Sequence, residues 1–390
     1  MEKQTERQME NPQIRHYLYS KAAVRHVPIS GDFELTPCCN MNCKMCYIRL
    51  SKEEQERAGR LRTAEEWIAL GKTCMEAGML FLLLTGGEPF LRPDFREIYE
   101  GLYKLGLVIS INSNGTLITR ETVEWLKEMP PTKINITLYG GSREAYEELC
   151  GYGDGYERAV AAILMLQEAG ISVNVNVSFT RENAKEREKI FAFIDEHDLP
   201  SRLTSYMFPP VRKQEGGGKK TGERLSPEEA GFLSWKCVQF RNRKKDWEEE
   251  RRRILNGLPE EIGDCPVDEQ MRCMAGRSMF WITWNWELRC CGTMTRPSIS
   301  VEPGNFMEKW EKLGKEMEYL LLPKECSVCE LRRACTVCGA TAQAEGSEVA
   351  HAETEAGASA ATEAKRAMEK KPEYLCRMTK EYVRLLRQES

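Results

Sequence analysis

Three cysteines near the amino terminus carry the clearest chemistry in this 390-residue chain. Cys39, Cys43 and Cys46 follow the pattern C-x3-C-x2-C. Thiolates with such short spacers can bind one iron–sulfur cluster and leave one of its irons without a protein ligand. An iron with an open coordination position can bind and reduce a substrate molecule. A zinc site or a plain ferredoxin loop is the alternative, because Cys38-x4-Cys43-x2-Cys46 is the plant-type ferredoxin spacing.

A second motif follows an apolar segment that is expected to be a strand. It reads Thr85-Gly86-Gly87-Glu88-Pro89. Two glycines at a strand end let a ligand approach the backbone, and the carboxylate beside them can accept hydrogen bonds from an ammonium group. This motif alone is weak evidence for a binding site. It becomes strong evidence because it comes one strand after the C-x3-C-x2-C motif.

The two motifs together resemble the radical S-adenosylmethionine (SAM) superfamily. The resemblance implies a 4Fe-4S cluster on Cys39, Cys43 and Cys46, whose free iron binds the amino and carboxyl groups of the SAM methionine. It also implies that electron transfer splits SAM to a 5′-deoxyadenosyl radical, which takes a hydrogen atom from the substrate. The SAM-binding residues implied by the resemblance are Tyr47, Gly86, Gly87, Glu88, Pro89, Asn112, Asn114 and Thr137.

Some residues of this half allow another interpretation or depart from the family pattern. Ordinary hydrogen bonding at turns and strand ends is the alternative role for Asn112, Asn114 and Thr137. Met45 stands where an aromatic residue is usual, with Tyr47 after it, and Tyr139 replaces the Asp of the common Leu-Asp-Gly. Cys150 stands before Gly151, where relatives often carry an arginine that reaches SAM.

Alternating strands and helices must position these motifs. Short apolar segments predict strands at 33–36, 80–84, 108–112, 133–138, 172–178 and 202–207. Helical apolar spacing predicts helices at 64–77, 94–105, 120–127, 155–169 and 184–196. Thr63 and Ser226 are expected to cap helices. Because this alternation is typical of parallel strands with right-handed crossovers, the expected fold class is α/β, a partial (β/α)6 TIM-type barrel.

A second group of cysteines lies in the carboxy-terminal third of the chain. Four of them follow the pattern C-x2-C-x5-C-x2-C from Cys326 to Cys338. This group resembles the SPASM domain, a module of many radical SAM enzymes that holds two auxiliary 4Fe-4S clusters. One implied ligand set is Cys326, Cys329, Cys335 and Cys376. The other is Cys273, Cys291 and Cys338, with Cys265 or Cys290 as a fourth ligand.

Other features of this region bear on that resemblance. The stretch 280–286 is expected to begin a hairpin between two ligands, and Trp286 falls where a glycine is expected. A zinc ribbon is the alternative, but x5 is a short spacer for a ribbon and zinc would leave three thiols unused. Cys74 and Cys237, and Cys150 with them, are predicted to be small buried hydrophobic residues.

Four segments follow from these patterns: a lead-in at 1–30, the radical SAM partial barrel at 31–210, a helical bridge at 211–260 and the SPASM domain at 261–390. The charge run at 244–253 is expected to be a solvated helix face. An Ala/Glu-rich insertion at 341–370 is expected to be mobile because it cannot bury a core. A closing helix is expected at 371–388.

Composition excludes several classes of protein. Lys+Arg number 56 and Asp+Glu 60, and this net charge of −4 excludes a generally basic nucleic-acid coat. No tract approaches the ~18 apolar residues of a membrane span. Sixteen cysteines behind an amino terminus without a secretory signal indicate metal-binding thiols in a reducing compartment. We expect a cytoplasmic protein without nucleic-acid or membrane partners.

The resemblance implies an enzyme, an oxidoreductase that crosslinks or otherwise oxidises a ribosomally made precursor peptide. Sulfatase maturation is disfavoured, because Gly292 follows Cys291 where the sulfatase-maturing relatives have an Asp. The alternative class is cofactor biosynthesis of the haem or quinone type. An iron–sulfur electron carrier is a third hypothesis, although a carrier needs no Gly-Gly-Glu motif. A flavodoxin- or ferredoxin-type reductant is implied by the family.

Overall fold

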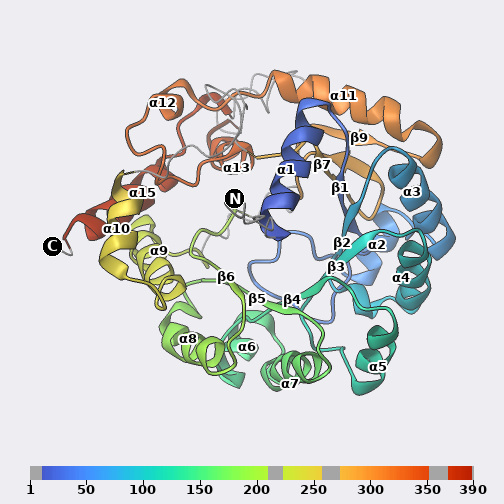
Figure 1. Ribbon diagram of the computed structural model, residues 1–390, viewed down its shortest axis with the longest axis horizontal. Helices are drawn as coiled ribbons and strands as arrows, with labels where there is room; N and C mark the ends of the chain where they lie inside the picture. Colours follow the sequence, from blue (N-terminus) through green and yellow to red (C-terminus); the bar gives the residue numbers. More distant parts are fainter. Residues whose placement is uncertain (1–10, 210–222, 257–272, 351–367, 389–390) are drawn as a thin grey trace, which may run out of the picture.

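One nine-stranded sheet runs through the molecule in the computed structural model, which describes residues 11–209, 223–256, 273–350 and 368–388 (Figure 1). Its strand order is β6-β5-β4-β3-β2-β1-β7-β8-β9. The first six strands pair in parallel. They are β1 (Ser30–Glu34), β2 (Phe81–Thr85), β3 (Val108–Ser113), β4 (Lys133–Thr137), β5 (Val173–Ser178) and β6 (Ser201–Thr204). The predicted partial (β/α)6 barrel is therefore confirmed.

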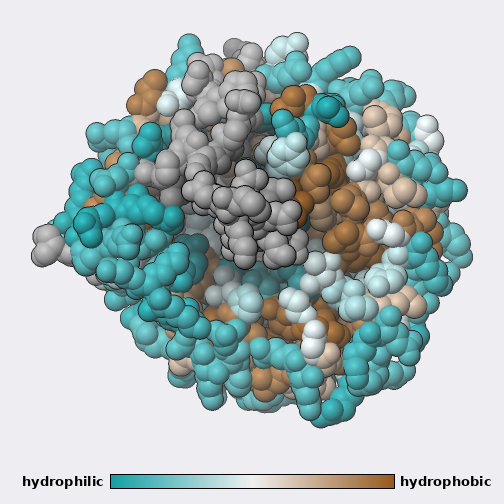
Figure 2. Space-filling model, viewed as in Figure 1, coloured by the Kyte–Doolittle hydropathy of each residue, from teal (hydrophilic) through white to brown (hydrophobic). Residues whose placement is uncertain are grey.

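Helices cover the outside of this curved sheet, as Figure 1 shows. They are α3 (Ala64–Glu76), α4 (Phe95–Lys104), α5 (Arg120–Glu128), α6 (Arg143–Cys150), α7 (Gly155–Glu168) and α8 (Arg187–Glu196). Figure 2 shows hydrophilic residues around the outer rim, where these helices lie, and hydrophobic residues gathered toward the middle. Within the described ranges, every helix is too short or too polar to cross a bilayer.

The strands have an apolar outer face and a largely polar inner face. Ile109, Ile111, Ile134 and Ile136 are at most 2% exposed and belong to the main core. Because side chains alternate along a strand, the residues between them point to the opposite, inner face of the sheet. On β3, β4 and β5 these inner residues are mostly amides and hydroxyls: Ser110, Asn112, Asn135, Thr137, Asn174, Asn176 and Ser178.

Helix starts follow the sequence signals. Thr63 and Ser226 each accept a hydrogen bond from the third helical amide, and the glutamate at that position accepts one from the backbone N–H of the capping residue. They begin α3 and α9 (Pro227–Arg241). Within the barrel, the helices α2 (Lys52–Ala58) and α6 were not predicted.

The amino-terminal helix α1 (Asn11–Val24) packs against the barrel. Tyr19 is 8% exposed, and its ring lies 5.4 Å from that of Phe81, the first residue of β2. Tyr19, Ala22 and Ile29 form a small core together. Because α1 leads into the amino end of β1 and packs against the first residue of β2, it lies toward the end of the sheet opposite to the predicted site.

The carboxy-terminal part continues the same sheet. Strand β7 (Met279–Ile282) pairs in parallel with β1 and in antiparallel with β8 (Glu287–Arg289), which pairs with β9 (Ser298–Ser300). The helices of this part are α10 (Trp247–Asn256), α11 (Phe306–Glu318), α12 (Lys324–Ser327), α13 (Gly339–Ala350) and α15 (Glu373–Gln388). Helix α10 has no buried residue, and α15 matches the predicted closing helix.

Trp286 turns the hairpin in the backbone conformation that glycine usually takes. Its φ is 61°, in the left-handed region that side chains disfavour. The ring is 1% exposed and packs edge-on against Trp67, with the Arg62 guanidinium 4.3 Å from its centre. Burial of this ring offsets the strain of the left-handed backbone.

The first residues of the predicted mobile insertion at 341–370 are ordered, which corrects that expectation. Helix α13 begins at Gly339, and Thr341 through Ala344 are buried. The Gln343 amide accepts from Thr295 N at 2.8 Å and donates to Arg296 O at 2.9 Å. This polar side chain ties the helix to the loop after β8. Residues 351–367, and residues 211–222 and 257–260 of the expected bridge, lie outside the described ranges.

Candidate functional site

The three cysteines of the first motif lie in the loop that follows β1. N–H groups surround their sulfurs: Met41 N donates to Cys39 Sγ at 3.4 Å and Arg49 N to Cys46 Sγ at 3.3 Å. Asn114 Nδ2 adds a bond of 3.6 Å to Cys39 Sγ. Such donors favour a sulfur that carries negative charge, so this loop fits an iron–sulfur cluster.

The thiols of this loop influence one another. Burial raises the pKa of Cys39 to about 12, and the nearby Cys43 and Cys46 add to the increase. A hydrogen bond with Cys150, followed by burial, raises the pKa of Cys43 well above its usual range. Without metal, Cys39 and Cys43 are therefore protonated at neutral pH, and loading of iron must release their protons.

The glycine motif packs against the cysteine loop. A Cβ on Gly87 would lie 2.2 Å from Cys38 O, and one on Gly86 would lie 2.5 Å from Thr36 O. Gly87 N donates to Thr36 O at 2.7 Å, and Glu88 N donates to Cys38 O at 2.9 Å. The glycines are needed here because two backbone segments meet with no room for a side chain.

Glu88 connects the ends of β2 and β3. Its carboxylate is fully buried and accepts hydrogen bonds from Phe90 N at 3.1 Å, Ser113 Oγ at 2.9 Å and Asn114 N at 2.7 Å. Burial raises the pKa of Glu88 to about 7, although these three donors act in the opposite direction. The group predicted to receive an ammonium is thus already bonded to the chain, and it fixes the position of Asn114.

The other predicted SAM-binding residues lie at the same edge of the sheet, because the carboxyl ends of parallel strands meet there. Asn114 donates to Asn40 Oδ1 at 2.9 Å, and Asn112 accepts from Asn135 Nδ2 at 2.8 Å. Thr137 ends β4 on the inner face. Pro89 is buried at the start of the turn after Glu88, and Tyr47 is half-buried in the cysteine loop. The structure brings these residues to one edge, and their contact with SAM stays a prediction.

Two residues beside the cysteine loop were not predicted as part of the site. Cys150 is fully buried, as expected of a core residue, but it is hydrogen-bonded to Cys43. Tyr139 is also hydrogen-bonded to Cys43. The sequence marked both positions only as departures from the family pattern, and their meeting at one sulfur depends on the fold.

Four of the carboxy-terminal cysteines surround a small cavity of about 70 Å³ between the α12 region and α15. They are Cys326, Cys329, Cys335 and Cys376, the first ligand set that the resemblance implied. Leu331 and Val337 complete the apolar part of the lining. Burial, and then the neighbouring thiols, raise the pKa of Cys326 to about 11. The four thiols therefore line the same cavity, as a common ligand set requires.

The second implied set is also close together. Burial raises the pKa of Cys273, and the Cys338 and Cys291 thiols add to this effect. Cys290 is buried, and its thiol donates to Met294 Sδ at 3.4 Å. Cys265 lies outside the described ranges. Among the residues that the structure describes, no three His, Cys, Asp or Glu side chains are placed to hold a single metal ion.

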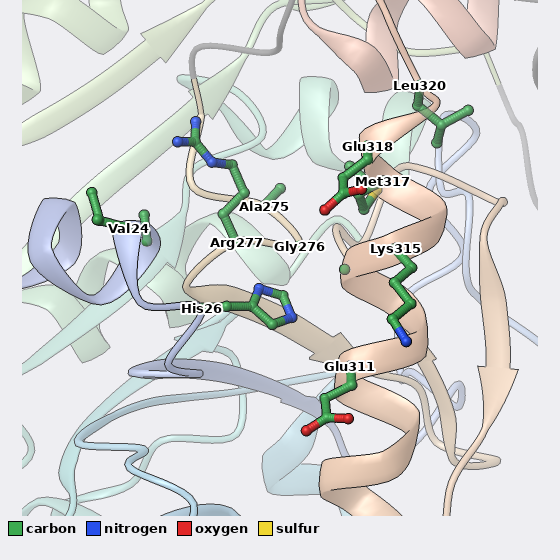
Figure 3. Close-up of a pocket in the computed structure, with 12 residues that line it drawn as sticks. Val24, His26, Ala275, Gly276, Arg277, Glu311, Lys315, Met317, Glu318 and Leu320 are labelled. Atoms are coloured by element: carbon green, nitrogen blue, oxygen red, sulfur yellow. The ribbon is translucent and has the colours of Figure 1, made fainter. Parts of the chain in front are cut away.

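A larger cavity of about 430 Å³ lies elsewhere, between the end of α1 and α11. In Figure 3, Glu311 and Lys315 of α11 face His26, and Arg277 lies on the opposite side. The His26 ring stacks on Trp310 with centres 4.4 Å apart. None of the predicted site residues lines this cavity, so it is separate from the candidate site.

Sequence similarity to known proteins extends over most of the chain. A family model described as the radical SAM superfamily matches residues 33–194. An AdoMet-dependent heme synthase of Oleidesulfovibrio alaskensis is 26% identical over 79% of this chain and 81% of its own length. A heme synthase of the same description from Methanosarcina barkeri is 25% identical, over 83% of this chain and 94% of its own.

Solved structures share the fold at lower identity. One is anSMEcpe with bound AdoMet, which matches at a TM-score of 0.66 and 17% identity over 93% of this chain and all of that chain. Another is Streptococcus suis SuiB bound to the precursor peptide SuiA, at a TM-score of 0.62 and 16% identity over 86% and 78% of the two chains. The family model and the cysteine loop after β1 agree: residues 33–194 match the radical SAM superfamily, the family that the two sequence motifs resemble.

Proposed function

We propose that this radical SAM/SPASM enzyme oxidatively modifies a ribosomally made precursor peptide and forms a crosslink in it. The cysteine loop supports the first part of this proposal, because two of its three cysteine sulfurs, Cys39 and Cys46, accept hydrogen bonds from N–H donors there. A 4Fe-4S cluster held by Cys39, Cys43 and Cys46 would supply the electron that splits SAM into methionine and a 5′-deoxyadenosyl radical.

The inner face of the sheet is the observation that carries the peptide proposal. Asn112 and Asn135 bond to each other, and Asn174 Nδ2 donates to Asn176 Oδ1 at 2.9 Å. Amide side chains both donate and accept, so they can pair with the N–H and C=O groups of a peptide. A flat apolar macrocycle would instead favour aliphatic and aromatic walls. The precursor peptide in the SuiB structure adds support from a protein of the same fold.

The crosslinking step requires an electron acceptor. The radical takes a hydrogen atom from a substrate carbon, and a bond between that carbon and a thiol sulfur then releases one proton and one electron. We propose that the two carboxy-terminal cysteine sets hold auxiliary 4Fe-4S clusters that receive this electron. One set is Cys326, Cys329, Cys335 and Cys376. The other contains Cys273, Cys291 and Cys338. A flavodoxin- or ferredoxin-type protein would reduce the enzyme.

A second candidate function is haem-type cofactor biosynthesis. The observation that favours it is the sequence similarity to two AdoMet-dependent heme synthases, which extends over about four-fifths of this chain. In that case the substrate would be a haem precursor in place of a peptide. The radical chemistry would be the same.

The decisive first experiment measures SAM cleavage. The protein is reconstituted anaerobically with iron and sulfide, reduced with dithionite and supplied with SAM. We expect 5′-deoxyadenosine and methionine from the native protein and neither from the C39A/C43A/C46A variant. Cys74→Ala is the control, since Cys74 is a buried cysteine of α3 with no predicted ligand role. Cleavage that persists in the triple variant would disprove the assignment of the site.

The second experiment distinguishes the substrate classes. Short peptides encoded beside the gene and haem precursors are offered separately to the active enzyme. A peptide that loses two hydrogen atoms, detected by mass spectrometry, is the expected result. Conversion of the haem precursor with unchanged peptides would transfer the assignment to the second function.

A further inference from the structure

Three polar side chains beside the first motif form a closed ring of hydrogen bonds. Thr116 Oγ1 donates to Asn114 Oδ1 at 2.7 Å, Asn114 Nδ2 donates to Asn40 Oδ1 at 2.9 Å, and Asn40 Nδ2 donates to Thr116 Oγ1 at 2.8 Å. Asn40 is half-buried in the cysteine loop, directly after Cys39. Asn114 and Thr116 follow β3 and are each 4% exposed. The ring therefore joins the loop after β1 to the turn after β3, through two residues, Asn40 and Thr116, that were not predicted as part of the site.

One backbone bond fixes the direction of the whole ring. Thr116 N donates to Asn114 Oδ1 at 2.9 Å, and because a backbone N–H can only donate, this atom of Asn114 is its carbonyl oxygen. The amide nitrogen of Asn114 must then face Asn40, whose own nitrogen faces the Thr116 hydroxyl. Neither amide can turn over without breaking at least two hydrogen bonds.

The ring leaves Asn114 with one N–H for the Cys39 sulfur. Nδ2 carries two hydrogens, of which one goes to Asn40, and Cys39 Sγ lies 3.6 Å from the same nitrogen. In the metal-free protein the Cys39 thiol donates to Asn40 Oδ1 at 3.9 Å. A cysteine that binds iron has lost this proton, so its sulfur can then only accept.

Glu88 holds the turn after β3 from its other side. Its carboxylate accepts from Asn114 N at 2.7 Å and from Ser113 Oγ at 2.9 Å, and Gly115 N donates to Ser113 Oγ at 2.9 Å. Gly115 has a φ of 78°, and a Cβ there would lie 3.0 Å from Ile136 Cγ2. The backbone of Asn114 is therefore fixed at the place from which its side chain reaches the cysteine loop.

We propose that Asn40 and Thr116 are positioning residues, which hold the Asn114 amide so that one N–H is directed at the Cys39 sulfur when it binds iron and raises the reduction potential of the SAM-cleaving cluster. Reduction adds negative charge to the ligand sulfurs, and a donor aimed at one of them stabilises the reduced form more than the oxidised form. Burial strengthens this effect, because the local dielectric constant is low. The inference rests on the proposed SAM-cleaving function.

The test separates the hydroxyl of Thr116 from its volume. Thr116→Val keeps the shape without the hydroxyl, whereas Thr116→Ser keeps the hydroxyl and loses a methyl group. Asn114→Asp keeps the oxygen that Thr116 N bonds and replaces the donor nitrogen with an oxygen. Thr73→Val is the control, since the Thr73 hydroxyl donates to Ala69 O within α3.

The midpoint potential is measured for the reduced-cluster electron paramagnetic resonance signal that changes when SAM is added. This criterion selects the SAM-binding cluster among the clusters of the protein. We expect a more negative potential in Asn114→Asp and Thr116→Val, with 5′-deoxyadenosine formed roughly tenfold more slowly in Asn114→Asp. Thr116→Ser and Thr73→Val should keep the native potential.

Three outcomes overturn the inference. An unchanged potential in Asn114→Asp means that the amide does not act on the cluster. A native potential in Thr116→Val means that its hydroxyl does not position the amide, and this variant decides alone if Asn114→Asp fails to assemble the cluster. Equal decreases in Thr116→Val and Thr116→Ser mean that Thr116 acts through packing.

Failure of this inference differs from failure of the proposed function. If the native protein forms no SAM-responsive signal and no 5′-deoxyadenosine, the proposed function fails. If it forms both and the variants leave the potential unchanged, only the role of Asn40, Asn114 and Thr116 fails.

Discussion

Asp32 is an ionisable group in the middle of β1 on the inner face of the sheet. Burial raises its pKa from 3.8 to about 7, and the positive charge of Arg15 on α1 opposes this shift only in part. Between these two pH values the folded chain keeps a proton that the unfolded chain has released. The free energy of unfolding must therefore decrease as the pH rises from about 4 to about 7.

The corresponding prediction concerns pH and stability. When the pH is raised from 5.5 to 7.5, the unfolding free energy of the native protein should fall by about 2 kcal/mol more than that of Asp32→Asn. Anaerobic urea titrations at both pH values measure this difference. Glu97→Gln, at an exposed carboxylate of α4, is the control and should behave like the native protein. An identical pH response in Asp32→Asn would show that Asp32 ionises normally.

At the scale of residues, the sequence indicated which positions belong to the candidate site, but it did not indicate which groups they contact. Gly86 and Gly87 were predicted to admit a ligand, and they admit the backbone of the cysteine loop. Glu88 was expected to face an ammonium group, and it is bonded to three groups of the chain. Such roles could not be predicted, because they depend on which loops the sheet brings together.

At the scale of elements, the hairpin of β7 and β8 depends on a tryptophan in a glycine position. Trp286→Gly removes the strain of the left-handed backbone, which should stabilise the fold by about 1–2 kcal/mol. It also removes a buried ring, which should destabilise the fold by about 3–5 kcal/mol. We expect a net loss of stability of about 2 kcal/mol. Trp286→Ala keeps most of the strain and also loses the ring, so it should be the least stable of the three proteins.

Chemical unfolding followed by circular dichroism measures this order. Tyr319→Ala, at a side chain that is 71% exposed, controls for the loss of an aromatic ring at the surface. A Trp286→Gly protein at least as stable as the native one would contradict the view that the Trp286 ring is essential packing.

The elements themselves were predicted to within a few residues wherever periodicity was long enough. Strands β1–β6 and the five long helices between them followed from apolar spacing. Helix α6 was missed because eight residues give barely two turns of periodicity. Helix α2 carried a usable signal, the Ser51–Glu54 capping box. The parallel pairing of β7 with β1 had no local signal, because it joins segments far apart in the chain.

At the scale of the whole molecule, the cysteine cavity joins the α12 region to α15. Cys376 comes from α15, whereas the other three lining cysteines lie between 326 and 335. With three four-iron clusters the native protein should bind about twelve irons, and Cys376→Ala should bind about eight. Cys237→Ala, at a buried cysteine of α9, should keep the native content.

Iron and zinc analysis of the purified, reconstituted proteins measures these contents. SAM-dependent spectral changes should survive in Cys376→Ala, because the loop after β1 is untouched. Native iron content in that variant would remove Cys376 from the ligand set, and zinc in place of iron would replace the auxiliary cluster with a zinc site.

The pairing of β7 with β1 has a mechanical consequence. Backbone pairs join Ser30–Phe33 to Met279–Ile282, so both halves of the chain share one continuous sheet. A hinge between them would break that ladder, and the spacing between the cysteine loop after β1 and strand β7 is therefore fixed. Electron tunnelling falls steeply with distance, so transfer between the proposed clusters should have one rate that no domain motion changes.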